Sequence, residues 1–253
     1  MTTPSFASLT TAVQEAVSSE QPVFLQFDAI DQPLADEFIS FVSTGEFERR
    51  HLRVSYDSHL RQLSINMPHY IHESTGDFVM YLWEGWEDVK LLPPDAADSI
   101  CRLSSPTVSG FVGRYEGSSK EPDYFLAPLG ASFPSVVFET GFPESGANLI
   151  TDKDLWIQGS GGATKAVILI HIIRRPDTGT GYEASLEVWR TTDCQRVVVF
   201  PDLLDEEEDP VITLGDLWGG HPVPTGCDKN QELPLPRQKL RASLLKAMRI
   251  SAE

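Results

Sequence analysis

The sequence predicts an α/β (α+β) fold, in which a central mixed β-sheet is flanked by helices. Two short apolar runs carry this prediction, SVVF at residues 135–138 and AVILI at residues 166–170. Runs of this length and composition are typical of strands buried on both faces. Between them, four residues are spaced as one face of a helix: Leu149, Asp152, Lys153 and Trp156. We therefore expect a strand, a helix and a second strand packed around one sheet.

Two carboxylates mark the strands at the centre of this prediction. Asp123 opens a predicted strand, PDYFLAP, and Glu139 ends the next one, PSVVFETG. The two side chains are expected to converge at one edge of the sheet, where they form a site or simply end their strands in water. Two hard oxygen ligands on adjacent strands are what Mg²⁺ requires, so the pair is a candidate metal site if a metal is retained.

The N-terminal part of the chain carries no recognisable chemistry. Amphipathic helices are predicted at residues 8–19 and 33–44, and residues 1–50 are interpreted as a helical extension. We expect this extension to cap the domain or to pair with another copy of the chain, as in a homodimer. A β-hairpin is predicted at residues 52–67, where apolar and polar residues alternate around a turn.

A helix is expected to begin near His72 and Glu73. His72 is either a proton-transfer group or a structural hydrogen-bonding residue. Three aromatic residues follow on the same helix: Tyr81, Trp83 and Trp86. They either line an apolar substrate pocket or belong to the core.

The core domain is predicted to cover residues 51–220. Its first strand is expected within residues 99–112, and an antiparallel pair, EASLEVWR and QRVVVFP, is expected to extend the sheet. The acidic run at residues 205–209 is interpreted as a solvated loop. His171 stands within the apolar strand at residues 166–175 and faces either the site or a partner inside the protein.

Residues 221–253 are predicted to form a linker and a basic amphipathic helix, RQKLRASLLKAMRI. This helix reverses the sign of charge of the rest of the chain. It is either an arm that contacts phosphate or a partner, or a helix docked on the protein's own acidic surface. The second interpretation is the one we adopt.

The composition argues against a nucleic-acid substrate. The 253 residues include 37 acidic and 20 basic ones, a net charge of −17, whereas affinity for DNA or RNA comes mostly from Lys and Arg. Three cysteines without metal-site spacing fit a reducing interior. The N-terminus lacks the pattern of a signal peptide, and no apolar run approaches the ~20 residues that cross a bilayer. We expect no membrane association and a cytoplasmic or nuclear protein.

At this point the chain resembles the PD-(D/E)XK nuclease superfamily. The resemblance is closest to a group of fungal nuclease-like proteins and to a bacterial group assigned as restriction endonucleases. It covers roughly residues 52–200 and rests on four stretches: Pro122-Asp123, Glu139, INMPHYIHE at residues 65–73 and LITDKDLW at residues 149–156. The resemblance implies a restriction-endonuclease-like core.

The resemblance also implies roles for individual residues. In that superfamily, the aspartate and glutamate hold one or two divalent ions, so Asp123 and Glu139 would bind Mg²⁺. A lysine two positions after the glutamate acts on the attacking water, but Gly141 stands there in this chain. Lys153 on the following helix is the candidate replacement, and a register shifted by one residue would put Asp152 there instead. Glu73 is the candidate for an additional acidic residue on the first helix.

Three functional hypotheses follow. The first is an enzyme without a cofactor that works on a small, largely apolar molecule by acid–base chemistry, such as cyclisation, isomerisation or elimination. It would use Asp123, Glu139 and His72, with the tryptophans shaping the pocket. The second is a Mg²⁺-dependent nuclease or phosphodiesterase that uses Lys153 and Glu73 as well. The third is a non-catalytic assembly protein. We adopt the first.

Overall fold

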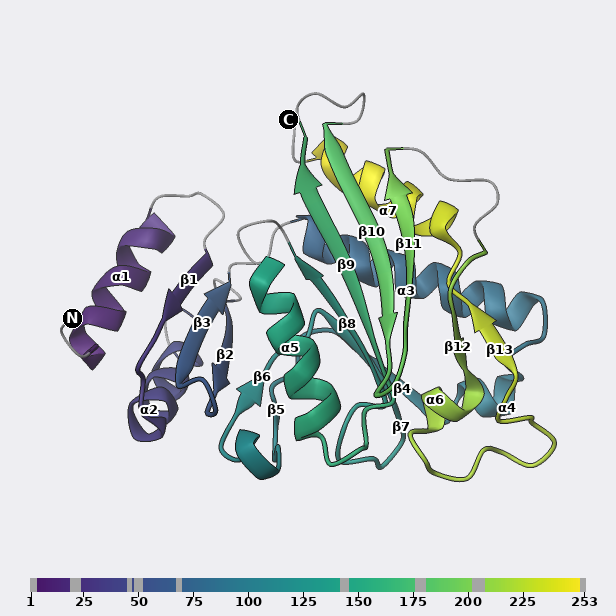
Figure 1. Ribbon diagram of the computed structural model, residues 1–253, viewed down its shortest axis with the longest axis horizontal. Helices are drawn as coiled ribbons and strands as arrows, with labels where there is room; N and C mark the ends of the chain where they lie inside the picture. Colours follow the sequence, from purple (N-terminus) through teal and green to yellow (C-terminus); the bar gives the residue numbers. More distant parts are fainter. Residues whose placement is uncertain are drawn as a thin grey trace. The chain divides into compact units, whose positions relative to one another are not determined.

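The computed structural model describes residues 4–18, 24–44, 47, 52–66, 70–141, 146–175, 181–201 and 208–250. The chain forms two compact units (Figure 1). Unit 1 combines Met1–His69 with Pro106–Glu121, and unit 2 combines Tyr70–Ser105 with Pro122–Glu253. The predicted boundary at residue 50 therefore differs from the observed division, because the hairpin that follows residue 50 is part of unit 1.

Unit 1 is a five-stranded sheet with two helices. The strand order is β1-β3-β2-β6-β5. The strands are β1 (Phe24–Phe27), β2 (Arg53–Asp57), β3 (Gln62–Asn66), β5 (Val108–Ser109) and β6 (Ser119–Lys120). The helices are α1 (Phe6–Ser18) and α2 (Gln32–Val42), and a short 3₁₀ turn covers Gly113–Tyr115. Both predicted helices and the predicted hairpin are confirmed, while β1 was not predicted.

The core of unit 1 lies between the helices and one face of this sheet. Leu9 and Phe38 from the helices are fully buried together with Leu63 and Ile65 from β3. Asp31 caps α2, because its Oδ1 accepts a hydrogen bond from the backbone N–H of Leu34 at 3.1 Å. The amphipathic patterns of both helices thus find the apolar face that they require.

Unit 2 contains the predicted central mixed sheet. Its strand order is β11-β10-β9-β8-β7-β4. The strands are β4 (Ile100–Leu103), β7 (Tyr124–Pro128), β8 (Val136–Gly141), β9 (Ala166–Arg174), β10 (Tyr182–Trp189) and β11 (Cys194–Phe200). β8 and β9 are parallel, and the other neighbouring strands are antiparallel. α5 (Gly146–Gly159) connects β8 to β9, as the sequence predicts.

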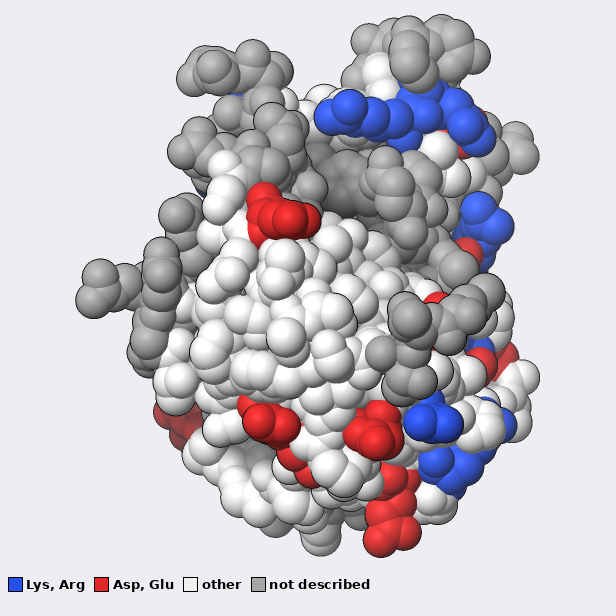
Figure 2. Space-filling model, turned by 90° about the vertical axis from the view of Figure 1, so that its left-hand side faces the viewer, with Lys and Arg blue, Asp and Glu red and all other residues white. Residues whose placement is uncertain are grey.

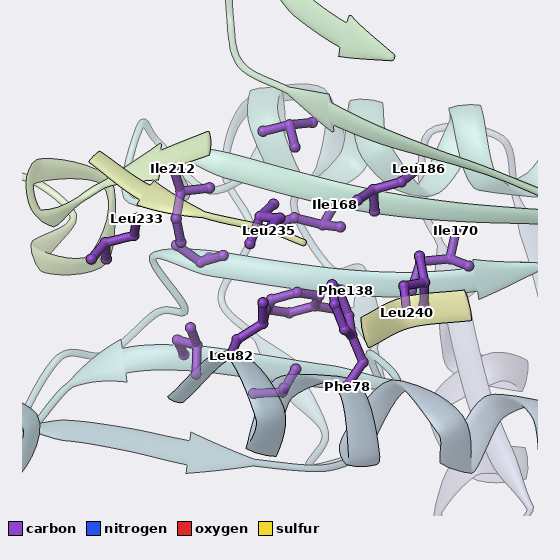
Figure 3. Close-up of a cluster of buried hydrophobic side chains, with 14 of the residues drawn as sticks. Phe78, Leu82, Phe138, Ile168, Ile170, Leu186, Ile212, Leu233, Leu235 and Leu240 are labelled. Carbon is purple, nitrogen blue, oxygen red and sulfur yellow. The ribbon is translucent and has the colours of Figure 1, made fainter. Parts of the chain in front are cut away.

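Helices cover both faces of the unit 2 sheet. α3 (Tyr70–Asp88) and α7 (Arg237–Ile250) pack against each other and against one face, whereas α5 packs on the other face over β8 and β9. Figure 3 shows the core on the first face, where Phe78 and Leu82 of α3 lie beneath Phe138 of β8. We call these two sides the α3 face and the α5 face.

Smaller elements complete unit 2. They are α4 (Pro94–Ala97), β12 (Val211–Thr213), α6 (Leu214–Trp218) and β13 (Glu232–Pro234). β12 and β13 pair as an antiparallel ribbon, so the predicted linker contains a strand. Thr213 ends β12 and starts α6 through a capping box with Asp216.

The structure corrects one expectation about a connecting segment and describes only part of another. Residues 99–112 do not form one strand, because β4 joins the sheet of unit 2 and β5 joins that of unit 1. Of the acidic run at 205–209, residues 205–207 lie outside the described residues. Asp209 is described, and its Oδ1 accepts hydrogen bonds from the backbone N–H of Arg237 at 3.0 Å and from Arg237 Nε at 3.1 Å.

The basic C-terminal helix α7 docks within unit 2. Leu240 and Leu244 are fully buried in the core on the α3 face. Its charges bind groups of the same unit: Lys246 Nζ lies 2.7 Å from Asp77 Oδ2, and Arg241 donates to the backbone oxygens of Val199 and Pro201. This agrees with the docked interpretation of the helix.

Candidate functional site

Four ionisable side chains lie on the α5 face of the unit 2 sheet. Asp123 precedes β7, Glu139 lies in β8, His171 in β9 and Glu187 in β10. Side chains alternate between the two faces of a strand. Next to the three residues in β8, β9 and β10, the neighbouring side chains belong to the α3 face, as the burial of Phe138, Ile170, Ile172, Leu186 and Val188 in that core shows.

The strand register fixes how these side chains are spaced. Glu139 and Glu187 are both partners of Leu169, from β8 and β10 respectively, so they stand about 10 Å apart across β9. One pair further along, His171 is the partner of Ser185 and of Gly141. Continuing the register of β7 and β8 by one residue places Asp123 opposite Glu139.

Asp123 and Glu139 are buried and held in place by hydrogen bonds. Their residues are 6% and 5% exposed. The backbone N–H of Thr140 donates to Asp123 Oδ2 at 2.6 Å, and Trp156 Nε1 on α5 donates to Glu139 Oε1 at 2.8 Å. The Thr140 hydroxyl lies 2.5 Å from that of Thr75, which ties β8 to α3. Asp123 and Glu139 thus lie on neighbouring segments of the sheet, and a hydrogen bond holds one oxygen of each.

Glu187 is the centre of a second charged group. His171 Nε2 lies 3.3 Å from Glu187 Oε2, but this buried nitrogen makes no aligned hydrogen bond with a described residue, so the contact is electrostatic. Trp189 Nε1 donates to the same oxygen at 2.6 Å, and Arg196 Nε lies 3.5 Å from Oε1. The imidazole of His171 is the main cause that lowers the pKa of Glu187, the Trp189 N–H and Arg196 add to it, and burial opposes them. Glu187 is therefore a carboxylate over the physiological range.

A pocket opens beside this group. Its volume is about 430 Å³, within the range of small-molecule sites. Ten residues from β9, β10 and β11 and the turn after β11 line it: His171, Ile173, Glu183, Ala184, Ser185, Glu187, Arg196, Val198, Phe200 and Pro201. The pocket extends from β9 toward β10 and β11, whereas α5 packs over β8 and β9.

Of the two predicted site residues on α5, Lys153 has contacts directed toward β10. The ammonium of Lys153 contacts Asp154 Oδ1 at 2.6 Å and the ring of Trp189 at 4.5 Å from its centroid. It therefore points along β10, and these contacts do not place it over Gly141. Asp152 is half-buried on the same helix.

Of the predicted site residues on α3, the two tryptophans lie on the other face of the sheet from the pair. Glu73 is exposed in the first turn of α3, and the side chain of His72 lies outside the part of the chain that the structure describes. Trp83 and Trp86 are 3% and 2% exposed in the core on the α3 face, where Trp86 Nε1 donates to the backbone oxygen of Pro234. Tyr81 is 40% exposed beneath Lys239. The aromatic cluster is thus core and surface, on the opposite side of the sheet from Asp123 and Glu139.

Sequence reasoning missed Ser185, Glu187 and Arg196. Their signal is the alternation in EASLEVWR, which places Glu183, Ser185 and Glu187 on one face of a strand. The same period puts His171 on one face of its own strand. These residues become neighbours only through the pairing register of the strands, which the alternation within each strand does not reveal.

Further findings concern metal binding, membrane spanning and similarity to known proteins. Among the described residues, His, Cys, Asp and Glu side chains form no group of three or more that could hold a metal ion. In that same part of the chain, no helix has the length and apolar character needed to span a membrane. A comparison with known protein families finds no family that matches, and a comparison with curated proteins finds no significant match.

Proposed function

We propose that this protein is an enzyme that works on a small, largely apolar molecule by acid–base chemistry. The observation that carries the proposal is the placement of His171 and Glu187 in the wall of a pocket of about 430 Å³. A concave site with apolar walls and a few convergent polar groups is the usual form of a small-molecule site. Cyclisation, isomerisation and elimination are the reactions that such groups serve without a cofactor.

His171 is the group that exchanges a proton with the substrate. Imidazoles are the commonest groups in general acid–base catalysis, where they both donate and accept protons. Glu187 holds the ring at the pocket wall, since its Oε2 lies 3.3 Å from His171 Nε2. Three donors surround Glu187, so it is suited to positioning rather than to proton transfer.

Asp123 and Glu139 supply a second carboxylate pair on the same face. The bonds from Thr140 and Trp156 fix one oxygen of each. Two acid–base centres on one face allow a proton to be removed at one substrate atom and delivered at another. Neither carboxylate is among the residues that line the pocket, so a substrate that meets both centres would have to reach from His171 on β9 to β8.

The charge of the chain also favours a small substrate over a polyanion. The net charge is −17. On the face that Figure 2 shows, the described Lys and Arg side chains lie in separate groups with Asp and Glu between them. A nucleic acid requires many cations along its backbone, whereas a small apolar substrate requires none.

Proton exchange at carbon tests the proposal without a known substrate. The full chain is incubated in D₂O with a mixture of small apolar ketones, lactones and unsaturated acids, and deuterium incorporation and new products are followed by NMR. We expect turnover that falls about 10²- to 10⁴-fold in His171→Gln. No exchange with the wild type, or exchange that is equal in His171→Gln and wild type, would contradict the proposal.

A second candidate is a Mg²⁺-dependent phosphodiesterase or nuclease. The buried pair of carboxylates favours it, because Asp123 and Glu139 face each other on neighbouring strands and offer the hard oxygen ligands that Mg²⁺ prefers. These residues would hold the ion, which would stabilise negative charge on a phosphate. Gly141 stands where the lysine of such a site would be, and Lys153 points toward Trp189. Another residue would therefore have to supply the cation beside the metal.

Metal titration separates the two candidates. Mg²⁺ and Mn²⁺ are titrated into the wild type, Asp123→Ala and Glu139→Ala, and DNA and RNA cleavage is then assayed with whichever ion binds. Binding that both substitutions abolish, together with cleavage, favours the phosphodiesterase. Absence of binding at millimolar metal removes it.

A further inference from the structure

The pocket on β9, β10 and β11 has a polar end and an apolar end. Glu187 and Arg196 are register partners, and His171 lies diagonally beside Glu187. One pair further along, Ser185 is the partner of Val198. Residues two apart on a strand are separated by about 7 Å, so the lining changes from charged to apolar within a single small molecule's length.

The apolar end has surface from Ile173, Val198 and Pro201, and Glu183 stands opposite Ile173 with its carboxylate paired to Arg175. Ile173 follows His171 on the same face of β9, and Val198 follows Arg196 on the same face of β11. Ile173 and Val198 are only partly buried, and Pro201 is exposed, so all three have apolar surface to offer a ligand. Covering such surface contributes roughly 25 cal/mol per Å².

The carboxylates of the pocket already have cationic or donor partners. Glu183 Oε2 lies 3.1 Å from Arg175 Nε. Glu187 accepts from Trp189 and has both His171 and Arg196 beside it. A ligand cation would therefore compete with cations that the protein itself provides.

The donors at the polar end are less completely used. The Arg196 side chain is 67% exposed, and its only ion pair with a described residue is the 3.5 Å contact with Glu187. His171 Nε2, in contrast, is buried and faces Glu187 Oε2 at 3.3 Å, so it is not open to a ligand. A guanidinium has five N–H donors in a planar fork that matches a carboxylate. The group missing from the polar end is thus an acceptor anion.

We infer that the pocket binds a small amphipathic carboxylate, with its anionic head on Arg196 and its apolar body on Ile173 and Val198. The inference deepens the proposed function and rests on it for the identification of the substrate, but the binding itself does not depend on turnover. It makes Arg196 the residue that determines specificity for the charged group.

Binding of three matched probes tests the inference. Octanoate, octylamine and 1-octanol share an apolar chain and differ in the charge of the head group. Each is titrated into the full-length chain and followed by isothermal titration calorimetry and by shifts of the imidazole resonances. Octanoate is expected to bind at least tenfold more tightly than octylamine.

Two variants locate the site. Arg196→Gln removes an exposed side chain and is expected to weaken octanoate binding about 10- to 100-fold, the range for a hydrogen bond to a charged group, while octanol binding stays unchanged. Arg102→Gln is the control, because Arg102 is an exposed arginine on β4, outside the pocket lining. It should leave the affinity for octanoate unchanged.

The inference is overturned if octanoate fails to bind the wild type at millimolar concentration, if octylamine binds equally well, or if Arg196→Gln binds octanoate as the wild type does. Its failure is distinguishable from that of the proposed function. Proton exchange that depends on His171 but without octanoate binding would keep the function and remove the inference. Octanoate binding through Arg196 in a protein without any proton exchange would do the opposite.

Discussion

His171 and Glu187 contact each other across the neighbouring strands β9 and β10 in the pocket wall, with 3.3 Å between Nε2 and Oε2. The pair is diagonal rather than directly opposite, since Ser185 is the register partner of His171. A diagonal arrangement keeps Ser185 and His171 side by side at the pocket.

The acid stability of the protein depends on Glu187. Because the folded-state pKa of Glu187 lies below its ordinary value, the carboxylate stabilises the fold above that value, and this contribution is lost as the pH falls through the lowered pKa. Glu187→Gln should therefore destabilise the protein more at about pH 7 than at about pH 3. Urea unfolding at the two pH values measures this.

Glu183→Gln, which removes a half-exposed ion pair, serves as the control and should have little effect at either pH. An equal loss at both pH values in Glu187→Gln would contradict the prediction.

Trp156 positions Glu139. Trp156→Phe keeps most of the buried ring but removes the N–H that donates to Glu139 Oε1 at 2.8 Å. We expect a loss of about 1–3 kcal/mol in the free energy of unfolding, the contribution of a buried hydrogen bond to a charged group. A double-mutant cycle with Glu139→Gln, measured by urea unfolding, isolates the pair. Strict additivity of the two single changes would show that the contact contributes nothing.

Much of unit 2 follows from sequence patterns. The apolar runs that become β8 and β9, the helical spacing of α5 and the alternation in β10 and β11 each describe a local period, and each element forms where its period predicts. The position of Asp123 and Glu139 on neighbouring strands follows from the same patterns. A short element such as β1 or β5 has too few residues to show a period, and these strands were missed or misplaced.

The remainder of the site depends on how helices and strands pack and pair, which the spacing of residues within one element does not reveal. The aromatic spacing of α3 predicts that Trp83 and Trp86 share a helical face, but which face of the sheet receives them depends on the connection from α3 to β4. Likewise, Glu187 becomes a neighbour of His171 only through the antiparallel register of β9 and β10. Sequence reasoning therefore found His171 but gave it no partner.

Apolar burial, rather than charge, docks α7. Leu244 is fully buried against the α3 face, whereas Lys246 reaches Asp77 from a side chain that is 62% exposed. Leu244→Ala should lower the free energy of unfolding by about 2–5 kcal/mol, because it removes buried methyl groups and leaves a cavity. Lys246→Ala should change it only slightly, as exposed ion pairs contribute little. Thermal and urea unfolding compare the two variants, and a larger effect of Lys246→Ala would show that the basic helix is held electrostatically.

Gly219 is required where α6 ends against β8. Its φ of 61° is the left-handed region, and a Cβ there would lie 2.9 Å from Ser135 Cβ and 3.2 Å from the backbone oxygen of Ala163. Ser135 has little freedom to move, because its hydroxyl donates to the backbone oxygens of Leu126 and Leu217. Gly219→Ala should therefore destabilise the protein by about 2–5 kcal/mol, the sum of the left-handed strain and the overpacking.

The matched control for this change is Gly130→Ala. Gly130 also has a left-handed φ, 81°, but nothing lies within 4 Å of the added Cβ. Its substitution should cost only the backbone strain, about 1–2 kcal/mol. Urea unfolding of both variants separates packing from strain, since the difference between them is the cost of the contact with Ser135. Equal destabilisation would mean that the backbone around residue 219 moves to accept the methyl group, and that the junction between α6 and β8 is looser than the contacts of Ser135 indicate.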